Sequence, residues 1–179
     1  MSIIRTYTGK NFNLKDPDPN QVDIEDIAHA LSNLCRFTGH TKFFYSVAQH
    51  SLLVSKMLLR DGYSHEVALY GLLHDATEAY IGDIASPLKN LIPVYKKIER
   101  RIEKTIAKKF NLNWRVARAI IKEYDLMALN TERRDLMGNP NWGMKLVGIF
   151  NRKTKHSPPN VSKRNFLDWY NYLQEKIAE

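Results

Sequence analysis

The stretch Gly71-Leu-Leu-His-Asp-Ala-Thr-Glu78 sets an imidazole and a carboxylate, His74 and Asp75, at the end of an apolar run. Successive side chains on a helix point about 100° apart, so both can bind one ion only where it lies against the helix between them. Glu78 lies three residues after Asp75 and four after His74, so it projects over the same patch. The segment suggests a divalent metal with a proton-transfer group beside it. Taken alone the pair is a weak signal, and a simple His–Asp hydrogen bond at a helix end explains it better.

Length and composition favour one globular domain. The chain has 179 residues, of which 44% are hydrophobic and 26% charged. No run approaches the ~18 consecutive apolar residues of a membrane span, and the first residues lack the apolar core of a signal peptide. The single cysteine, Cys35, excludes an internal disulfide and suits a reducing compartment. We expect a cytoplasmic protein with no membrane partner.

The net charge of +8 calls for an acidic partner or a role in solubility. Many of the cations fall between residues 96 and 109, in the pattern of a solvated helix face. Nucleic-acid binding would interleave basic residues with exposed aromatics, whereas the aromatics here fall at core-like positions. A small polyphosphate or nucleotide ligand fits the charge equally well. Nucleic acid is the less favoured partner, although charge alone does not decide.

Apolar residues at helical spacing predict an all-α fold, a single helical bundle. Asp23, Ser46, Ser64 and Ser162 are the expected N-caps, and Ser46 forms a capping box with Gln49. We expect the core over about residues 20–137, after an irregular N-terminal arm over 1–20 and before a C-terminal loop and helix over 138–179. Residues 82–89 and 139–161 are expected to be irregular. The predicted helices cover about residues 24–36, 47–60, 65–75, 94–110, 114–137 and 162–177.

Two further residues are candidates to share an ion with the His–Asp pair. His50 follows the capping box among apolar neighbours, one helical hairpin before His74. Asp125 lies in an otherwise apolar helix segment, where an unpaired carboxylate costs several kcal/mol. His50, His74, Asp75 and Asp125 together offer two nitrogens and two oxygens. That mix suits Mn, Co, Fe, Ni or Zn better than Ca, and positions left to water would make the site catalytic.

The order of these residues resembles the H…HD…D signature of the HD-domain metal-dependent phosphohydrolases. The resemblance spans roughly residues 20–137 and includes the short sequence segments around each candidate ligand. It is closest to the small bacterial and phage branch with deoxyribonucleoside 5′-monophosphatases and phage dATP triphosphohydrolases. The matching segments are Ser46-Val-Ala-Gln-His-Ser51, His74-Asp-Ala-Thr-Glu-Ala-Tyr-Ile-Gly-Asp83, Ser86-Pro-Leu-Lys89 and Asp125-Leu-Met-Ala-Leu129.

The resemblance implies a helical bundle around one divalent ion (Mn, Co, Zn, Fe, Ni or Mg) that activates water for attack on phosphorus. It implies that Glu78 assists that water and that Asp83 holds the sugar or a catalytic water. It also implies that Lys89 neutralises phosphate. Asp83 as a turn cap and Lys89 as a surface lysine stay open as simpler interpretations. Relatives in this superfamily often form oligomers, so a homo-oligomer is expected.

Substrate contacts are expected in the loop before His50. The monophosphatase branch has an Arg-Trp pair there that holds phosphate and excludes a ribose 2′-hydroxyl. This chain has Arg36 followed by Phe37. The phenyl ring can exclude the 2′-hydroxyl by its size but lacks the indole N–H donor, so deoxyribose selectivity is an expectation only. The remaining candidate phosphate or base contacts of the loop are His40, Thr41, Lys42 and Tyr45.

The leading hypothesis is therefore a metal-dependent phosphohydrolase of deoxynucleotides, either a 5′-monophosphatase or a dATP/dNTP triphosphohydrolase. The cationic Arg36–Tyr45 loop looks closer to the phage proteins and keeps the triphosphate alternative open. One other hypothesis is a hydrolase of (p)ppGpp or a cyclic nucleotide, disfavoured because the chain has a single His–Asp set. A non-catalytic nucleotide- or nucleic-acid-binding helical protein is the third, and Glu78 beside a full ligand set argues against it.

Overall fold

A computed structural model describes residues 2–137 and 147–179, and this part of the chain is mostly helical, as expected for an all-α protein. Two short 3-10 turns, Pro19–Gln21 and Arg36–Gly39, flank the first helix. The strands are β1 (Ile3–Arg5) and β2 (Asn11–Asn13). The helices are α1 (Ile24–Asn33), α2 (Val47–Arg60), α3 (His65–Leu73), α4 (Glu78–Ile81), α5 (Ser86–Leu91), α6 (Pro93–Lys109), α7 (Trp114–Leu136) and α8 (Pro159–Ala178).

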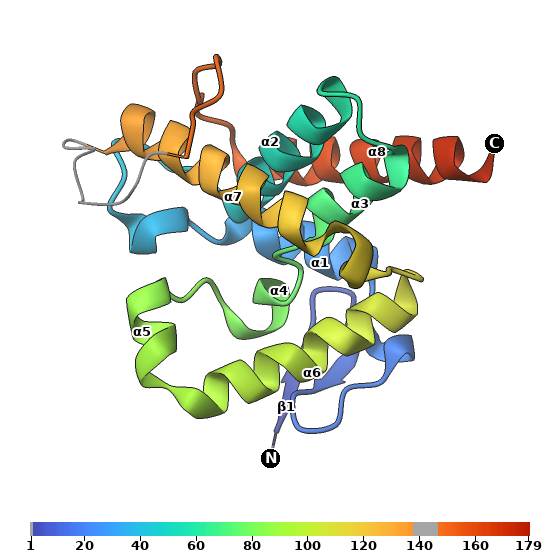
Figure 1. The fold of residues 1–179 in the computed structure, drawn as a ribbon. Coiled ribbons are helices and arrows are strands. Elements are labelled where there is room, and N and C mark those ends of the chain that lie inside the picture. Colours follow the sequence, from blue (N-terminus) through green and yellow to red (C-terminus); the bar gives the residue numbers. More distant parts are fainter. Residues whose placement is uncertain (1, 138–146) are drawn as a thin grey trace.

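Five helices form the main packed body. α2 lies against α3, α7 crosses both of them, and α8 runs along α1 and α3 (Figure 1). α5 and α6 form a separate layer beneath this body, and the β-hairpin lies behind α6 (Figure 1). The core between the helices is apolar and fully buried at Leu31, Val54, Leu58, Leu72, Leu73 and Phe166. No helix in the described residues is long and apolar enough to cross a membrane.

Three predicted caps are confirmed. Asp23 accepts a hydrogen bond from the Glu25 amide at 2.9 Å. Ser46 and Gln49 exchange their two capping bonds at 3.2 Å each and fix the start of α2. Ser64 caps α3. The local sequence thus sets where these helices begin, and the start of α2 in turn sets the place of His50.

We expected an irregular N-terminal arm, and this prediction was wrong: the arm contains an antiparallel hairpin. Ile4 pairs with Phe12 in the register of the two strands. Phe12 is fully buried and stacks on Tyr80, with 3.8 Å between ring centroids. Asp26 of α1 accepts hydrogen bonds from the amide and hydroxyl of Thr8. These long-range contacts order strands too short to be recognised from local pattern.

The His–Asp pair does not continue a helix, contrary to expectation. α3 ends at Leu73, and residues 74–77 form tight turns in which Ala76 donates to the Leu73 carbonyl and Glu78 to the Asp75 carbonyl. Glu78 therefore begins a new short helix, α4, rather than lying one turn along α3. The predicted loop 82–89 is also wrong in part, because α5 begins at Ser86 with Pro87 in its first turn.

Two other boundaries differ from the sequence prediction. α1 ends at Asn33, and the chain turns through the 3-10 segment at Arg36. α8 begins at Pro159, so Ser162 lies inside the helix and donates to the Ser157 hydroxyl instead of capping. Of the segment expected to be irregular over 139–161, residues 147–158 are irregular as predicted, whereas 138–146 lie outside the described residues.

Candidate metal centre

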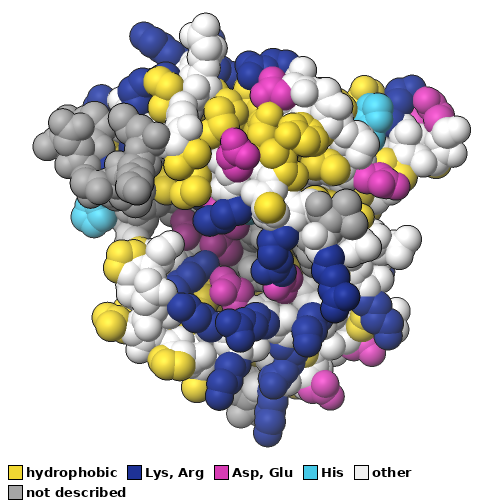
Figure 2. Space-filling model, in the orientation of Figure 1, with side chains coloured by type: hydrophobic (Ala, Val, Ile, Leu, Met, Phe, Trp, Pro, Cys, Tyr) yellow, Lys and Arg dark blue, Asp and Glu magenta, His cyan; other side chains and the backbone are white. Residues whose placement is uncertain are grey.

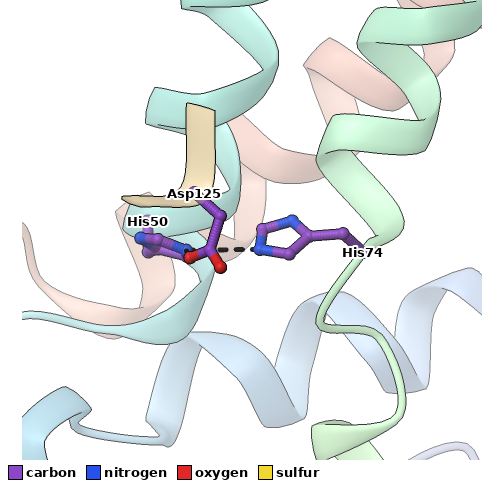
Figure 3. A group of neighbouring side chains, drawn as sticks. All are labelled: His50, His74 and Asp125. Atoms are coloured by element: carbon purple, nitrogen blue, oxygen red, sulfur yellow. Dashed lines mark hydrogen bonds and ion pairs between the residues drawn. The ribbon is translucent and has the colours of Figure 1, made fainter. Parts of the chain in front are cut away.

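Three side chains from three elements converge in the middle of the body. His50 comes from the first turn of α2, His74 from the turn after α3, and Asp125 from the middle of α7 (Figure 3). The Nε2 atoms of the two histidines lie 3.3 Å apart, and Oδ1 of Asp125 lies 3.3 Å from the His50 Nε2. The three residues together can supply one ligand atom each to a single metal ion.

Asp75, the fourth ligand predicted from the sequence, lies beside the two histidines. Its Oδ2 lies 3.2 Å from Nε2 of His74 and 3.6 Å from Nε2 of His50. Neighbouring ligands around an octahedral ion with bonds of about 2.1 Å are separated by about 3 Å. His50, His74 and Asp125 are thus spaced as donor atoms around one ion, with Asp75 beside the two imidazoles, and the mixed nitrogen and oxygen set fits a first-row divalent metal.

The outer nitrogens of both histidines are fixed by acceptors. Nδ1 of His50 donates to Oε1 of Glu132 at 2.7 Å, and Nδ1 of His74 donates to the Gly71 carbonyl at 2.7 Å. Carboxylates and carbonyls only accept, so each Nδ1 carries a proton, and a ring without a second proton turns an Nε2 lone pair toward the other ring. Two such lone pairs 3.3 Å apart repel unless a proton or a metal cation lies between them.

The electrostatics of the cluster favour a positive charge at this point. Burial and the nearby Arg36 oppose protonation of His50, yet Glu132 and Asp125 raise the pKa of that ring to about 9. Burial also opposes ionisation of the two carboxyls, but the histidines hold the pKa of Asp75 and of Asp125 well below the usual value. The site therefore retains ionised carboxylates beside imidazoles, which is the donor set that a divalent ion requires.

Glu132 is a site residue that the sequence reasoning missed. Its side chain is fully buried, and Oε2 accepts from Nε of Arg36 at 3.0 Å while Oε1 holds His50. The Tyr45 hydroxyl also contacts this carboxylate. Glu132 lies seven residues after Asp125, two helical turns along the same face of α7. The seven-residue spacing from Asp125 was the sequence signal that Glu132 faces the site. The charged residues around Glu132, however, are typical of a solvent-exposed helix end.

The predicted proton-transfer residue lies beside the cluster on α4. Glu78 is 5% exposed, Oε1 lies 3.3 Å from Nζ of Lys89, and Oε2 has no hydrogen-bond partner among the described residues. Burial, and then the charges of Asp75 and Asp83, raise the pKa of Glu78. Burial likewise raises the pKa of Asp83, which is half-buried at the end of α4. Lys89 joins Glu78 to Glu99 of α6, with 2.9 Å from Nζ to the second carboxylate.

The loop before His50 is divided between two environments. Arg36 points inward, with Nη1 3.7 Å from Oδ2 of Asp75 and its guanidinium 5.5 Å from the Phe37 ring centroid. Phe37 itself is half-buried and has a left-handed backbone with φ of +54°. The buried Tyr45 lies against Glu132. Arg36 therefore contacts Asp75 directly, whereas Phe37 and Tyr45 lie next to Arg36 and Glu132, which themselves contact the cluster.

The middle of that loop faces elsewhere. His40 is exposed, and the hydroxyl of Thr41 donates to the carbonyl of Phe43 within the loop. The backbone amide and ammonium of Lys42 donate to the carbonyls of Leu136 and Asp135 at the end of α7. These contacts explain how the loop is held, and the substrate roles of His40, Thr41 and Lys42 stay predictions.

An opening beside the metal ligands leads to solvent. A cavity of about 180 Å³ is lined by His74 and Asp125, by Arg118 and Lys122 of α7, and by Glu103 of α6, which lies 2.7 Å from the Arg118 guanidinium. Nζ of Lys122 lies 2.8 Å from Oδ2 of Asp125. Figure 2 shows Asp and Glu side chains within the hollow between α7 and the α5–α6 layer, with Lys and Arg side chains crowding its edges. An anionic ligand can therefore approach the acidic cluster through a positively charged rim.

Comparison with known proteins places the chain in a family. It is 46% identical over 136 residues to the protein YfdR of Escherichia coli (strain K12), and the match covers 76% of this chain and 73% of that protein. The chain belongs to the YfdR family. A second relative, RCAP_rcc00048 of Rhodobacter capsulatus, is 38% identical over 113 residues, which cover 60% of this chain and 58% of that protein. No family model matches the chain.

Both relatives are described as uncharacterized proteins. Membership of the YfdR family therefore brings no stated activity with it, and the chemistry has to be argued from the cluster itself. In this member of the YfdR family that cluster combines two oriented imidazoles, two ionised carboxylates and a buried carboxylate, one oxygen of which has no partner within residues 2–137 and 147–179.

Proposed function

We propose that this protein is a divalent-metal-dependent phosphohydrolase of nucleotides. The observation that carries the proposal is the pair of oriented Nε2 atoms, 3.3 Å apart, with Asp75 and Asp125 beside them. The resemblance to the HD-domain phosphohydrolases supports the same conclusion, because its four signature residues are those that converge. His50, His74, Asp75 and Asp125 would hold the ion, which when bound supplies a Lewis acid and a water of lowered pKa.

The residues around the ligands have distinct tasks in this proposal. Glu78 lies buried, and its Oε2 has no hydrogen-bond partner in the part of the chain that the structure describes, so it can accept a proton from the attacking water and hold it for the leaving group. Arg36 and Lys89 carry positive charge close to Asp75 and Glu78, where a phosphoryl group would gain negative charge in the transition state. Asp83 orients the sugar or a second water, and Phe37 limits space beside the sugar.

The charged rim supports a nucleotide as the substrate. Arg118 and Lys122 line the opening next to His74, paired with Glu103 and Asp125, and can exchange these partners for further phosphates. This arrangement suits both substrates proposed from the sequence, a deoxynucleoside monophosphate and a deoxynucleoside triphosphate. Homo-oligomerisation and a cytoplasmic location stay predictions from the sequence.

Product analysis tests the proposal directly. The purified chain would be incubated with panels of deoxynucleoside mono- and triphosphates in the presence of Mn, Co, Zn or Mg. Release of phosphate from monophosphates identifies a nucleotidase, and release of tripolyphosphate or pyrophosphate from triphosphates identifies a triphosphohydrolase. Turnover of (p)ppGpp alone would change the substrate class. Nucleotide binding without turnover under every metal would overturn the enzymatic proposal.

The role of Glu78 has its own test. Glu78→Gln keeps the shape of the side chain but removes its basicity, so turnover is expected to fall about 100-fold or more. The metal affinity, measured by calorimetry, should stay within a few-fold because Glu78 is not among the ligands. Glu123→Gln, on the exposed face of α7, makes the same chemical change as a control. Full turnover by the Glu78 variant would remove the residue from the mechanism.

A further inference from the structure

A second cavity lies away from the metal cluster, between α2, α8 and the segment 152–157. Its volume of about 430 Å³ falls within the range of about 300–1,000 Å³ typical of small-molecule sites. Gln49, Leu53 and Lys56 line it from one face of α2, whereas His50 projects from another face of the same helix toward the metal cluster. The two sites therefore use different sides of α2.

The walls of this cavity are strongly cationic. Lys56, Arg152, Lys153, Lys155 and His156 all line it, and no carboxylate is found among the described residues of the lining. None of the ion pairs found in residues 2–137 and 147–179 involves the four Lys and Arg side chains. Burial, and then the charge of Arg152, lower the pKa of Lys56. These groups repel one another without an internal counter-charge.

The cationic segment is held in place by its backbone. Gln49 donates to the Lys155 carbonyl at 2.8 Å, and the amide of Thr154 donates to Asp135 at 2.7 Å. His156 donates from Nδ1 to the carbonyl of Phe44 at 3.2 Å. The ammonium of Lys56, on α2, lies 5.0 Å from the ring centroid of Trp169 on α8. Converging cations on an anchored backbone form a preorganised anion site rather than a set of independent surface charges.

We propose that this cavity binds a phosphate-bearing anion at a site separate from the metal cluster. Lys56 and Arg152 neutralise it, Lys153 and Lys155 add charge at the edge, and the Ser157 hydroxyl and Asn165 amide supply neutral donors. Leu52 and Leu53 give one wall an apolar surface that a nucleoside can cover. The phosphate can thus belong to a nucleotide or to an inorganic polyphosphate.

The site also has a contact with the metal centre. Tyr45 lines the cavity, and burial together with the charge of Glu132, the carboxylate that accepts from Nδ1 of His50, raises the pKa of its hydroxyl. Binding at this site needs neither metal nor turnover, so the inference does not depend on the proposed function. Its test can fail while the hydrolase proposal stands, and the reverse also holds.

Calorimetric titration of the full chain with tripolyphosphate, without added divalent metal and at fixed ionic strength, tests the inference. The double variant Lys56→Gln/Arg152→Gln should weaken binding about tenfold or more, because it removes two charge-assisted contacts to the anion. Arg100→Gln/Lys108→Gln removes the same charge from exposed positions of α6 and should change affinity by less than about twofold. Circular dichroism of both variants checks that they fold alike, and Lys155→Gln gives a milder second variant on the exposed segment.

Three outcomes would overturn the inference. They are equal weakening by both double variants, unchanged binding in the cavity variants, and loss of binding in His74→Ala while the cavity variants retain it. A parallel titration with ATP distinguishes the two sources of phosphate. Tighter binding of ATP that is lost in Lys56→Gln/Arg152→Gln assigns the site to a nucleotide. Equal affinities of ATP and tripolyphosphate assign it to the polyphosphate group alone.

Discussion

The helices that carry the metal cluster and the layer formed by α5 and α6 are held in different ways. α2 and α3 pack through fully buried side chains such as Leu58 and Leu72. In α5 and the start of α6, by contrast, Leu88, Leu91 and Val94 are 48%, 78% and 62% exposed. Figure 1 shows this layer set apart beneath the main body. α6 packs against the apolar core through Ile98, Ile102 and Ile106, whereas α5 is tied to the body by the ion pair between Lys89 and Glu78.

This difference in packing separates the residues that would hold the metal from those that would contact water and phosphate. The four candidate ligands come from the densely packed body, so their relative positions are fixed by the core. Glu78 begins α4, Asp83 follows that helix and Lys89 lies in α5, where Glu99 of α6 holds it. Asp83 and Lys89 thus lie on the less tightly packed side, where local opening costs less free energy, whereas Glu78 is buried.

The largest expected effect is at Glu132. Glu132→Ala should lower the free energy of unfolding by about 3–5 kcal/mol, because it leaves the buried Arg36 without its partner. Metal affinity should also fall about 10–100-fold, because the His50 ring loses the acceptor that orients it. Urea unfolding and metal titration measure the two effects. Glu123→Ala, exposed on the same helix, is the control, and equal stability of the two variants would contradict a tightly held cluster.

A pair of variants on α6 tests how the α5–α6 layer is anchored. Ile102→Ala should cost about 2–5 kcal/mol because Ile102 is fully buried. Val94→Ala, eight residues earlier on the same helix, should change stability by no more than about 0.5 kcal/mol. Chemical denaturation of both variants gives the comparison. A large loss in the Val94 variant would show that the first turn of α6 is covered in solution.

Gly71→Ala tests the packing of the ligand helices. A Cβ atom at this position would lie 2.5 Å from Cδ1 of the buried Leu58 and 3.4 Å from Cα of Ser55. We expect a loss of about 1–3 kcal/mol, because α2 and α3 must separate or repack. Thermal unfolding with and without metal measures the effect. Gly62→Ala is unsuitable as a control because its φ is +90°, so Ala79→Gly, an ordinary change on α4, serves to calibrate the method.

The smallest expected effect is at the cap of α1 and depends on pH. Burial opposes ionisation of Asp23, but the Glu25 amide and Lys10 lower its pKa below the usual 3.8. Because the folded pKa is depressed, the stabilisation is present above the unfolded value and is lost as pH falls through the folded one. Asp23→Ala should cost about 1 kcal/mol at neutral pH and progressively less below about pH 4. Unfolding at several pH values, with Asp16→Ala as control, measures this; a pH-independent difference would contradict it.

Much of the helical framework could be predicted from the sequence because its signals are local. Asp23, Ser46 and Ser64 stop or start helices through their own hydrogen bonds, whatever lies elsewhere in the chain. The hairpin over residues 3–13 could not be predicted in this way. Its three-residue strands owe their order to Tyr80 and Asp26, which are distant in sequence.

The same division holds within the candidate site. The sequence by itself singled out His50, His74, Asp75 and Asp125, because a histidine or carboxylate within an apolar helical run is costly without a partner. Only the tertiary structure decided that Glu132 and Arg36 form a buried pair behind His50, since a charged residue near a helix end looks the same whether it faces solvent or core. It also decided that Glu78 begins a new helix, because the turns at residues 74–77 bend the chain around the cluster. Local sequence fixes which groups are available, and packing fixes which of them meet.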